Sequence, residues 1–175
     1  MRRTKAILIL AVCAAAAPAA DFSGARALEF TRQAVAFGPR PPGSPAIEKL
    51  RAFLIGQLRA WRWEVTEDAF TAQTPRGPIP MRNIIARRRG RPGREVVLTG
   101  HYDSKWMPSI RFVGANDGGA STGFLLEMAR AFADRPYAGD IVLVWFDGEE
   151  AFGEWSATDG IYGSRHLAAR WASEG

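Results

Sequence analysis

The amino-acid sequence predicts an α/β protein with three layers, in which helices flank a mixed, mostly parallel sheet. Residues 141–146 form a continuous apolar run, which is typical of a strand buried on both faces. A strand-like segment, 95–100, and a helix-like segment, 120–134, precede it. Because a strand–helix–strand unit folds as a right-handed crossover, its two strands are expected to be parallel neighbours. The chain of 175 residues is long enough for one domain with a hydrophobic core.

Two helices are expected before this unit. The first covers residues 25–36 and ends at the Pro/Gly-rich segment 38–43, because proline cannot continue a helix. Ser44 and Pro45 are typical of a helix N-cap and of the first helical position. Apolar residues then recur at helical spacing through about Trp61, which predicts a second helix with one apolar face.

A pair of strands is expected between the second helix and the parallel unit. Residues 63–69 and 81–87 are strand-like, and the Pro/Gly-rich stretch 74–80 between them predicts a turn that joins an antiparallel pair. Glycine and proline also mark the next connection, and the arginines around it predict a solvated turn: Arg87, Arg88, Arg89, Arg91 and Arg94.

Residues 1–20 are expected to be a signal peptide, so the chain is expected to be secreted or periplasmic. A basic start precedes a short apolar run, 6–17, and small residues at the cleavage position. The apolar run is too short to span a bilayer, so no stable membrane anchor is expected. Cys13 lies in a context similar to a lipoprotein acylation site, but Val12 is larger than the residue usual there.

Removal of this segment narrows the functions that the composition allows. The formal net charge falls from +5 to +2, because 20 Lys and Arg residues then face 18 Asp and Glu residues. This balance excludes binding of nucleic acid through a basic patch. The mature chain would also contain no cysteine, so it would have no disulfide and no thiol nucleophile, and a metal site must use His, Asp and Glu.

Polar residues follow both parallel strands and occupy the loop between them. His101 and Asp103 come after the first strand, and Glu149 and Glu150 come after the second. Asp117 lies in the glycine-rich loop that opens the intervening helix. Because ligands bind at the carboxyl edge of the strands in an open α/β sheet, we expect these side chains to meet at one edge.

The donor types in this cluster suit zinc. His101, Asp117 and one of the glutamates at 149 and 150 are plausible ligands. Asp103 lies two residues after His101, so it points the same way and can orient the imidazole from outside the ligand set. The remaining glutamate would act as a general base. Taken singly, each residue also fits a structural role, as a hydrogen-bonded histidine, a turn aspartate or a surface glutamate, and their conjunction favours the metal site.

A serine hydrolase is the rival interpretation. Ser121 lies in a G-x-S-x-G pattern at 119–123, and Asp147 and His166 follow in the order that such an enzyme uses. However, a glycine-rich loop rather than a strand leads into the serine. Ser121 is therefore more typical of a helix start than of a nucleophile.

Four segments of the chain resemble glutaminyl cyclases: PPGSPA at 41–46, HYDSK at 101–105, FVGANDGGAS at 112–121 and FDGEEAFGEWSATDGIYGSRHLA at 146–168. This family shares the fold of the zinc aminopeptidases, so the resemblance implies a zinc-exopeptidase-like fold. In the family a further histidine ligand lies well beyond the GEE motif. The resemblance therefore implies that residues 21–175 are the N-terminal part of a zinc-dependent cyclase or peptidase domain, with its C-terminal part missing.

The resemblance also implies a reaction and a role for each site residue. Asp117 and Glu150 would bind zinc, and Glu149 would be the general acid/base. Trp155 would bind substrate by shaping the pocket, and His101 would be a metal ligand only if a second zinc is bound. The implied reaction converts the N-terminal glutamine of a peptide substrate to pyroglutamate and releases ammonia.

Two alternatives stay open. A secreted zinc aminopeptidase has the same fold, and residues 116–121 are closer to its sequence. Lys105 and the thirteen-residue spacing from the GEE motif to Gly163, with Trp155 inside it, favour the cyclases instead. The second alternative is an inactive remnant that binds only a metal or a partner, because two carboxylates plus water make a weak zinc site. His166 could complete that site, and an incomplete domain is expected to expose apolar surface.

Overall fold

The computed structural model describes residues 21–174, so the expected signal peptide at 1–20 lies outside the described residues. Every helix and strand expected from the sequence is present within that range. In chain order the elements are α1 (Gly24–Ala36), α2 (Pro45–Ala60), β1 (Glu64–Thr74), β2 (Gly77–Arg88), β3 (Glu95–His101), the short kinked segment η1 (Ala115–Ala120), α3 (Ser121–Ala131), β4 (Asp140–Phe146) and α4 (Tyr162–Glu174).

The four strands form one mixed sheet in the order β1-β2-β4-β3. β3 and β4 are parallel neighbours, as the strand–helix–strand pattern predicts. β2 pairs antiparallel with both β1 and β4. The α/β class and the mixed sheet are confirmed, but the expectation of mostly parallel pairing is wrong for residues 21–174. The reason is that the β1–β2 hairpin adds two antiparallel pairs beside the single parallel one.

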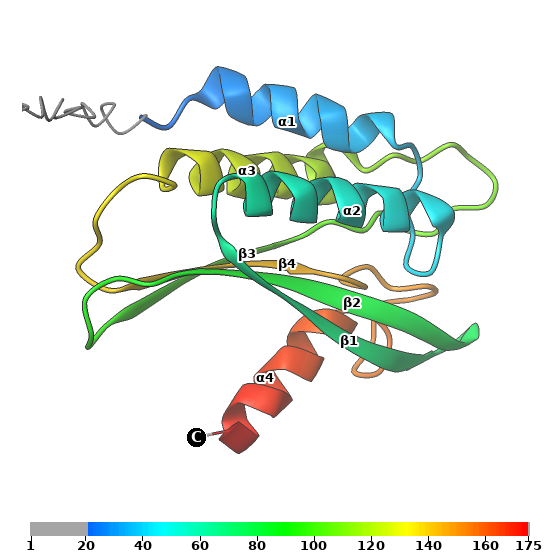
Figure 1. The fold of residues 1–175 in the computed structure, drawn as a ribbon. Coiled ribbons are helices and arrows are strands. Elements are labelled where there is room, and N and C mark those ends of the chain that lie inside the picture. Colours follow the sequence, from blue (N-terminus) through cyan, green and yellow to red (C-terminus); the bar gives the residue numbers. More distant parts are fainter. Residues whose placement is uncertain (1–20, 175) are drawn as a thin grey trace, which may run out of the picture.

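The helices lie on both faces of the sheet, which gives the expected layered arrangement (Figure 1). α2 and α3 cover one face, with α1 packed on α3, and α4 covers the opposite face. The Oγ of Ser44 accepts a hydrogen bond from the backbone N–H of Ile47 at 3.2 Å, so this residue is the predicted N-cap of α2. Within residues 21–174, no helix is both long enough and apolar enough to cross a membrane.

The β1–β2 hairpin is longer and its turn tighter than the sequence predicts. Pro78 and Pro80 belong to β2, where they lie opposite Gln73 and Thr71 of β1. β2 pairs with β4 only from Ile84 onward, so the side of β2 away from β1 is an open edge at both prolines. An open edge tolerates proline because no ladder hydrogen bond is lost there.

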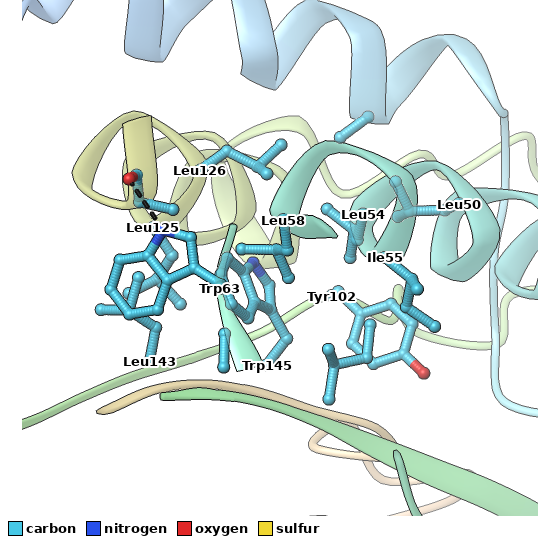
Figure 2. Close-up of a cluster of buried hydrophobic side chains, with 14 of the residues drawn as sticks. Leu50, Leu54, Ile55, Leu58, Trp63, Tyr102, Leu125, Leu126, Leu143 and Trp145 are labelled. Carbon is cyan, nitrogen blue, oxygen red and sulfur yellow. Dashed lines mark hydrogen bonds between the residues drawn. The ribbon is translucent and has the colours of Figure 1, made fainter. Parts of the chain in front are cut away.

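The main core lies between the sheet and the helices α2 and α3 (Figure 2). Its members are fully or almost fully buried and include Leu50, Leu54, Ile55, Leu58, Trp63, Tyr102, Leu125, Leu126, Leu143 and Trp145. The indole N–H of Trp63 donates to the carbonyl of Ala129 at 3.0 Å. Burial of each large apolar side chain stabilises the fold by roughly 1.5–3 kcal/mol. This core fixes the strands whose ends carry the polar cluster.

The arginine-rich connection is more structured than expected. Arg88 donates to the carbonyls of Trp61, Arg62 and Ala133, and therefore ties β2 to the ends of α2 and α3. Arg87 pairs with Asp140, among others. The interpretation as a solvated turn is wrong for these two residues, which belong to β2. Apolar surface is exposed on β3, where Val96 and Val97 are 49% and 37% accessible.

Candidate functional site

The parallel strands bring the predicted polar residues to one edge of the sheet. His101 ends β3 opposite Phe146, which ends β4, and the backbone N–H of Tyr102 donates to the carbonyl of Phe146 at 3.1 Å. Asp103 is fully buried just beyond. Its carboxylate accepts hydrogen bonds from the backbone N–H groups of Glu149 at 3.1 Å and Glu150 at 3.2 Å. Asp103 thus holds the turn that presents both glutamates.

His101 lies between two carboxylates. Its Nδ1 is 3.2 Å from Oδ1 of Asp103, and its Nε2 is 2.9 Å from Oδ1 of Asp117. Burial lowers the pKa of His101, but the hydrogen bond and charge of Asp103, together with Glu149 and Asp117, outweigh burial and raise it to about 9. The acidic neighbours of the imidazole therefore favour its protonated form. The predicted contact between His101 and Asp103 is present, and it leaves Nε2 directed at Asp117.

The loop that carries Asp117 needs glycine at the next position. Gly118 has φ +74°, and a Cβ added there would lie 2.2 Å from the carbonyl oxygen of Asp103 and 3.2 Å from the His101 ring. No side chain fits in that space. The close approach of the two backbones lets the Asp117 carboxylate, which is 61% exposed, reach the histidine.

Arg40 anchors this loop, a role that sequence reasoning missed. Its guanidinium is fully buried and donates to three backbone carbonyls, those of Tyr102, Val113 and Gly114. Both ends of the 102–114 segment are thereby tied to one side chain. Burial lowers the pKa of Arg40, and the charge of Asp103 opposes that effect. An arginine within a Pro/Gly-rich segment gives no sequence signal of burial, because its acceptors are distant in the chain.

The two glutamates differ in environment. Glu150 is only 6% exposed, and burial, followed by the charges of Asp117 and Asp103, raises its pKa to about 7. Glu149 is more accessible, and burial is also the main cause of its raised pKa, against the opposing charge of His101. Clustered carboxylates repel one another, and a bound cation would relieve that repulsion.

The donor chemistry of this edge fits part of a zinc site. Asp117 and Glu150 would supply carboxylate oxygens. In the described range 21–174, no three His, Asp, Glu or Cys side chains are grouped closely enough to hold a metal ion. Further ligands are needed to complete a four-coordinate site. The roles of Asp117, Glu150 and His101 as ligands stay predictions.

The structure does not assemble the serine hydrolase alternative. The Ser121 hydroxyl donates to the carbonyl of His101 at 2.8 Å. Asp147 instead accepts from Arg51 at 2.9 Å, and His166 lies 3.2 Å from Asp68 and stacks on Phe70. Three residues that would form a triad therefore have three separate sets of partners. His166 on α4 is engaged with Asp68 and Phe70, which gives it a structural role in the described part of the chain.

Trp155 lies in the segment between β4 and α4. It is 53% exposed, and its ring covers Gly160, where an added Cβ would come within 2.4 Å of it. The Asp159 carboxylate organises the segment by accepting from the backbone N–H groups of Phe152 and Gly153. The N–H of Ile161 donates to the carbonyl of Glu149 at 2.7 Å. The segment that carries Trp155 is thus tied directly to the backbone of the proposed acid/base.

Comparisons with known proteins agree with this geometry. The family model described as peptidase family M28 matches residues 83–174. Glutaminyl-peptide cyclotransferase of Drosophila melanogaster is 38% identical over 143 residues, which are 78% of this chain and 40% of the relative. The crystal structure of an Acidobacteriales bacterium glutaminyl cyclase is 43% identical with a TM-score of 0.84, over 92% of this chain and 57% of that one. A Zn-dependent exopeptidase from Parabacteroides distasonis is 27% identical with a TM-score of 0.75, over 86% and 56%. The chain therefore spans 40% to 57% of the length of these proteins.

Proposed function

Because this chain belongs to peptidase family M28 and is similar to glutaminyl cyclases, we propose that it converts an N-terminal glutamine of a peptide to pyroglutamate. The observation that carries the proposal is the meeting of Asp117, Glu149 and Glu150 at one strand edge, beside the segment that carries Trp155. We further propose that the reaction depends on zinc held by Asp117 and Glu150.

Glu149 is the residue that would move the proton. Its carboxylate would accept a proton from the α-amine as the nitrogen attacks the carbonyl carbon of the glutamine side-chain carboxamide. It would then return that proton to the departing nitrogen, which leaves as ammonia when the carbon–nitrogen bond of the carboxamide breaks. A bound zinc ion would polarise the γ-carbonyl oxygen. The raised pKa of Glu149 supports this role, because an acid/base works best when its pKa lies near the working pH.

Asp103 and the Trp155 segment would position these groups. Asp103 fixes the backbone of both glutamates through two hydrogen bonds, and the segment around Trp155 is bonded to the carbonyl of Glu149. Trp155 would provide an apolar wall for the glutamine side chain. Residues 1–20 resemble a signal peptide in their basic start and apolar run, which supports a secreted or periplasmic site of action.

Aminopeptidase activity is the second candidate. The similarity to the Parabacteroides exopeptidase favours it, as does the placement of His101 at 2.9 Å from Asp117, because both side chains would be available as metal ligands. Glu149 would then activate a water molecule against the first peptide bond. His101 would be a ligand in this reaction, whereas it would be structural in the cyclase.

Mass spectrometry of a glutamine-initiated peptide, incubated with the protein and zinc, separates these reactions. Loss of ammonia alone establishes a cyclase, and loss of the first residue establishes an aminopeptidase. A chelator should abolish either activity, and a serine-directed fluorophosphonate should not. An unchanged peptide would contradict both reactions and favour the remnant that only binds a metal or a partner.

A further inference from the structure

We propose that a cleft beside this site binds an acidic side chain of the peptide, a few residues after its N-terminal glutamine. This proposal rests on the function proposed above and narrows its substrate class. The cleft has a volume of about 400 Å³, within the usual range of roughly 300–1,000 Å³ for ligand pockets. Three prolines, two aromatic residues and four other residues line it: Pro41, Pro42, Pro80, Trp106, Phe152, Gly43, Ser44, Arg76 and Ile79.

The cleft is continuous with the segments that carry the catalytic cluster. Phe152 follows Glu150 by two residues, and Trp106 follows Lys105, whose ammonium group donates to the carbonyl of Ala151 at 2.9 Å. Phe152 and Trp106 also belong to one apolar cluster. In Figure 1 the α1–α2 connection, the tip of the β1–β2 hairpin and the segments after β3 and β4 all lie at the same end of the molecule. A peptide that places its N-terminus at the site can therefore extend into the cleft.

Arg76 gives the cleft its charge preference. Its guanidinium stacks over the Trp106 ring at 3.7 Å from the ring centroid. It is the one charged side chain among the described lining residues, and no ion pair of Arg76 is found within residues 21–174. A stacked guanidinium keeps its edge N–H groups available for a carboxylate, which it can bind through two parallel hydrogen bonds. The complementary ligand is therefore an aspartate or glutamate side chain.

The cleft is formed by rigid parts of the chain. Gly43 has φ +78°, and a Cβ added there would lie 3.1 Å from Cγ2 of Ile79, so the turn before α2 approaches β2 closely. Prolines on both sides restrict the backbone. A ligand that enters a rigid cleft avoids the cost of ordering it, so even an exposed arginine can discriminate between peptides.

Two peptide series test the proposal. One series begins with glutamine and the other with pyroglutamate, and in both the third to sixth positions carry in turn a glutamate, a serine or a lysine. Ammonia release gives kcat and KM, and calorimetric binding of the same peptides made with N-terminal pyroglutamate gives affinity without turnover. At one position glutamate should lower KM about three- to fivefold relative to serine, the size expected of an exposed ion pair.

Charge reversal provides the decisive comparison. Arg76→Glu should remove the preference for glutamate and create one for lysine, and Trp106→Ala should weaken the original preference. Arg91→Glu, an exposed residue on the connection at the opposite end of the sheet, should change neither. An unchanged ratio of glutamate to lysine peptides in Arg76→Glu overturns the proposal. If no peptide releases ammonia but the pyroglutamate peptides bind with the Arg76 dependence, the cleft assignment holds and the cyclase function fails.

Discussion

Two sets of carboxylates lie near the ends of β3 and β4. They differ in the number of hydrogen bonds that their side chains accept from the rest of the chain. Asp103 and Asp147 are fully buried and hold several donors each, and we call them the supported carboxylates. Asp147 accepts from Arg51, from the backbone N–H of Arg82 and from the Tyr102 hydroxyl. The second set, which we call the open carboxylates, comprises Asp117, Glu149 and Glu150. In the described part of the chain, no hydrogen bond to the Glu150 carboxylate is found.

The difference distinguishes carboxylates that stabilise the fold from carboxylates that are available for catalysis. A buried carboxylate is stable only when hydrogen bonds and charges compensate its desolvation, and Asp103 meets this condition within the chain. Asp147 meets it only in part, because its Oδ1 has no hydrogen-bond partner within residues 21–174, and burial, followed by the charge of Asp103, raises its pKa to about 7. The open set meets it poorly, which is why burial and mutual repulsion raise the pKa values of Glu149 and Glu150. Groups left in this state are typical of functional sites. The comparison predicts that changes to the open set alter catalysis, whereas changes to the supports alter folding.

The substitution with the largest expected effect on activity is Glu149→Gln in the open set. An amide keeps the shape of the side chain but cannot accept the proton, so turnover should fall by about 10²–10⁴-fold. Zinc content and thermal stability should stay near those of the unchanged protein, because the glutamine leaves the backbone contacts with Asp103 in place. Ammonia release and metal analysis measure both properties. Glu154→Gln, an exposed neighbour in the same segment, is the matched control, and an active Glu149→Gln protein would remove the assigned role.

Arg40→Ala tests whether the residues that support the site stabilise the fold. It leaves three carbonyls without their donor and opens a cavity, so the free energy of unfolding should fall by about 3 kcal/mol. Denaturant unfolding measures this change. Arg91→Ala, on an exposed loop, should shift it by less than about 0.5 kcal/mol. Equal effects of the two substitutions would show that the 102–114 segment does not depend on Arg40.

The sequence predicted the positions of the open set and of Asp103 better than the contacts of Arg40. Glu149, Glu150 and Asp117 stand beside strands and glycines that local patterns reveal, so their meeting at one edge followed from the crossover rule. Arg40 could not be recognised, because its acceptors lie more than sixty positions away and are backbone atoms. The pairing of β2 with β4 escaped prediction for a related reason, since apolar strands do not specify their neighbours. Long-range polar contacts carry no local signature.

Gly118 lies beside Asp117 of the open set and against the backbone of Asp103 of the supported set. Gly118→Ala should therefore have an intermediate effect on stability and on zinc binding. The added methyl group would meet the backbone of Asp103, in a conformation that already disfavours side chains. We expect a loss of about 1–3 kcal/mol in unfolding free energy and weaker zinc binding, as Asp117 moves. Gly77→Ala is the control, because its φ is +90° but nothing lies within 4 Å of the added Cβ. If both variants lose the same stability and zinc binds equally, the contact with Asp103 has no role.

Trp155→Ala should produce the smallest change in stability. The side chain is half exposed and rests on Gly160, so its removal should cost less than about 1 kcal/mol of stability. If it forms a wall for the glutamine side chain, KM should rise about three- to tenfold while zinc affinity stays constant, because lost apolar contact weakens substrate and not metal. Phe22→Ala is the control. It removes another exposed aromatic ring, which packs against Phe124, and it should leave KM unchanged. Parallel losses of zinc and substrate affinity in Trp155→Ala would instead assign the tryptophan to the support of Glu149 and Glu150.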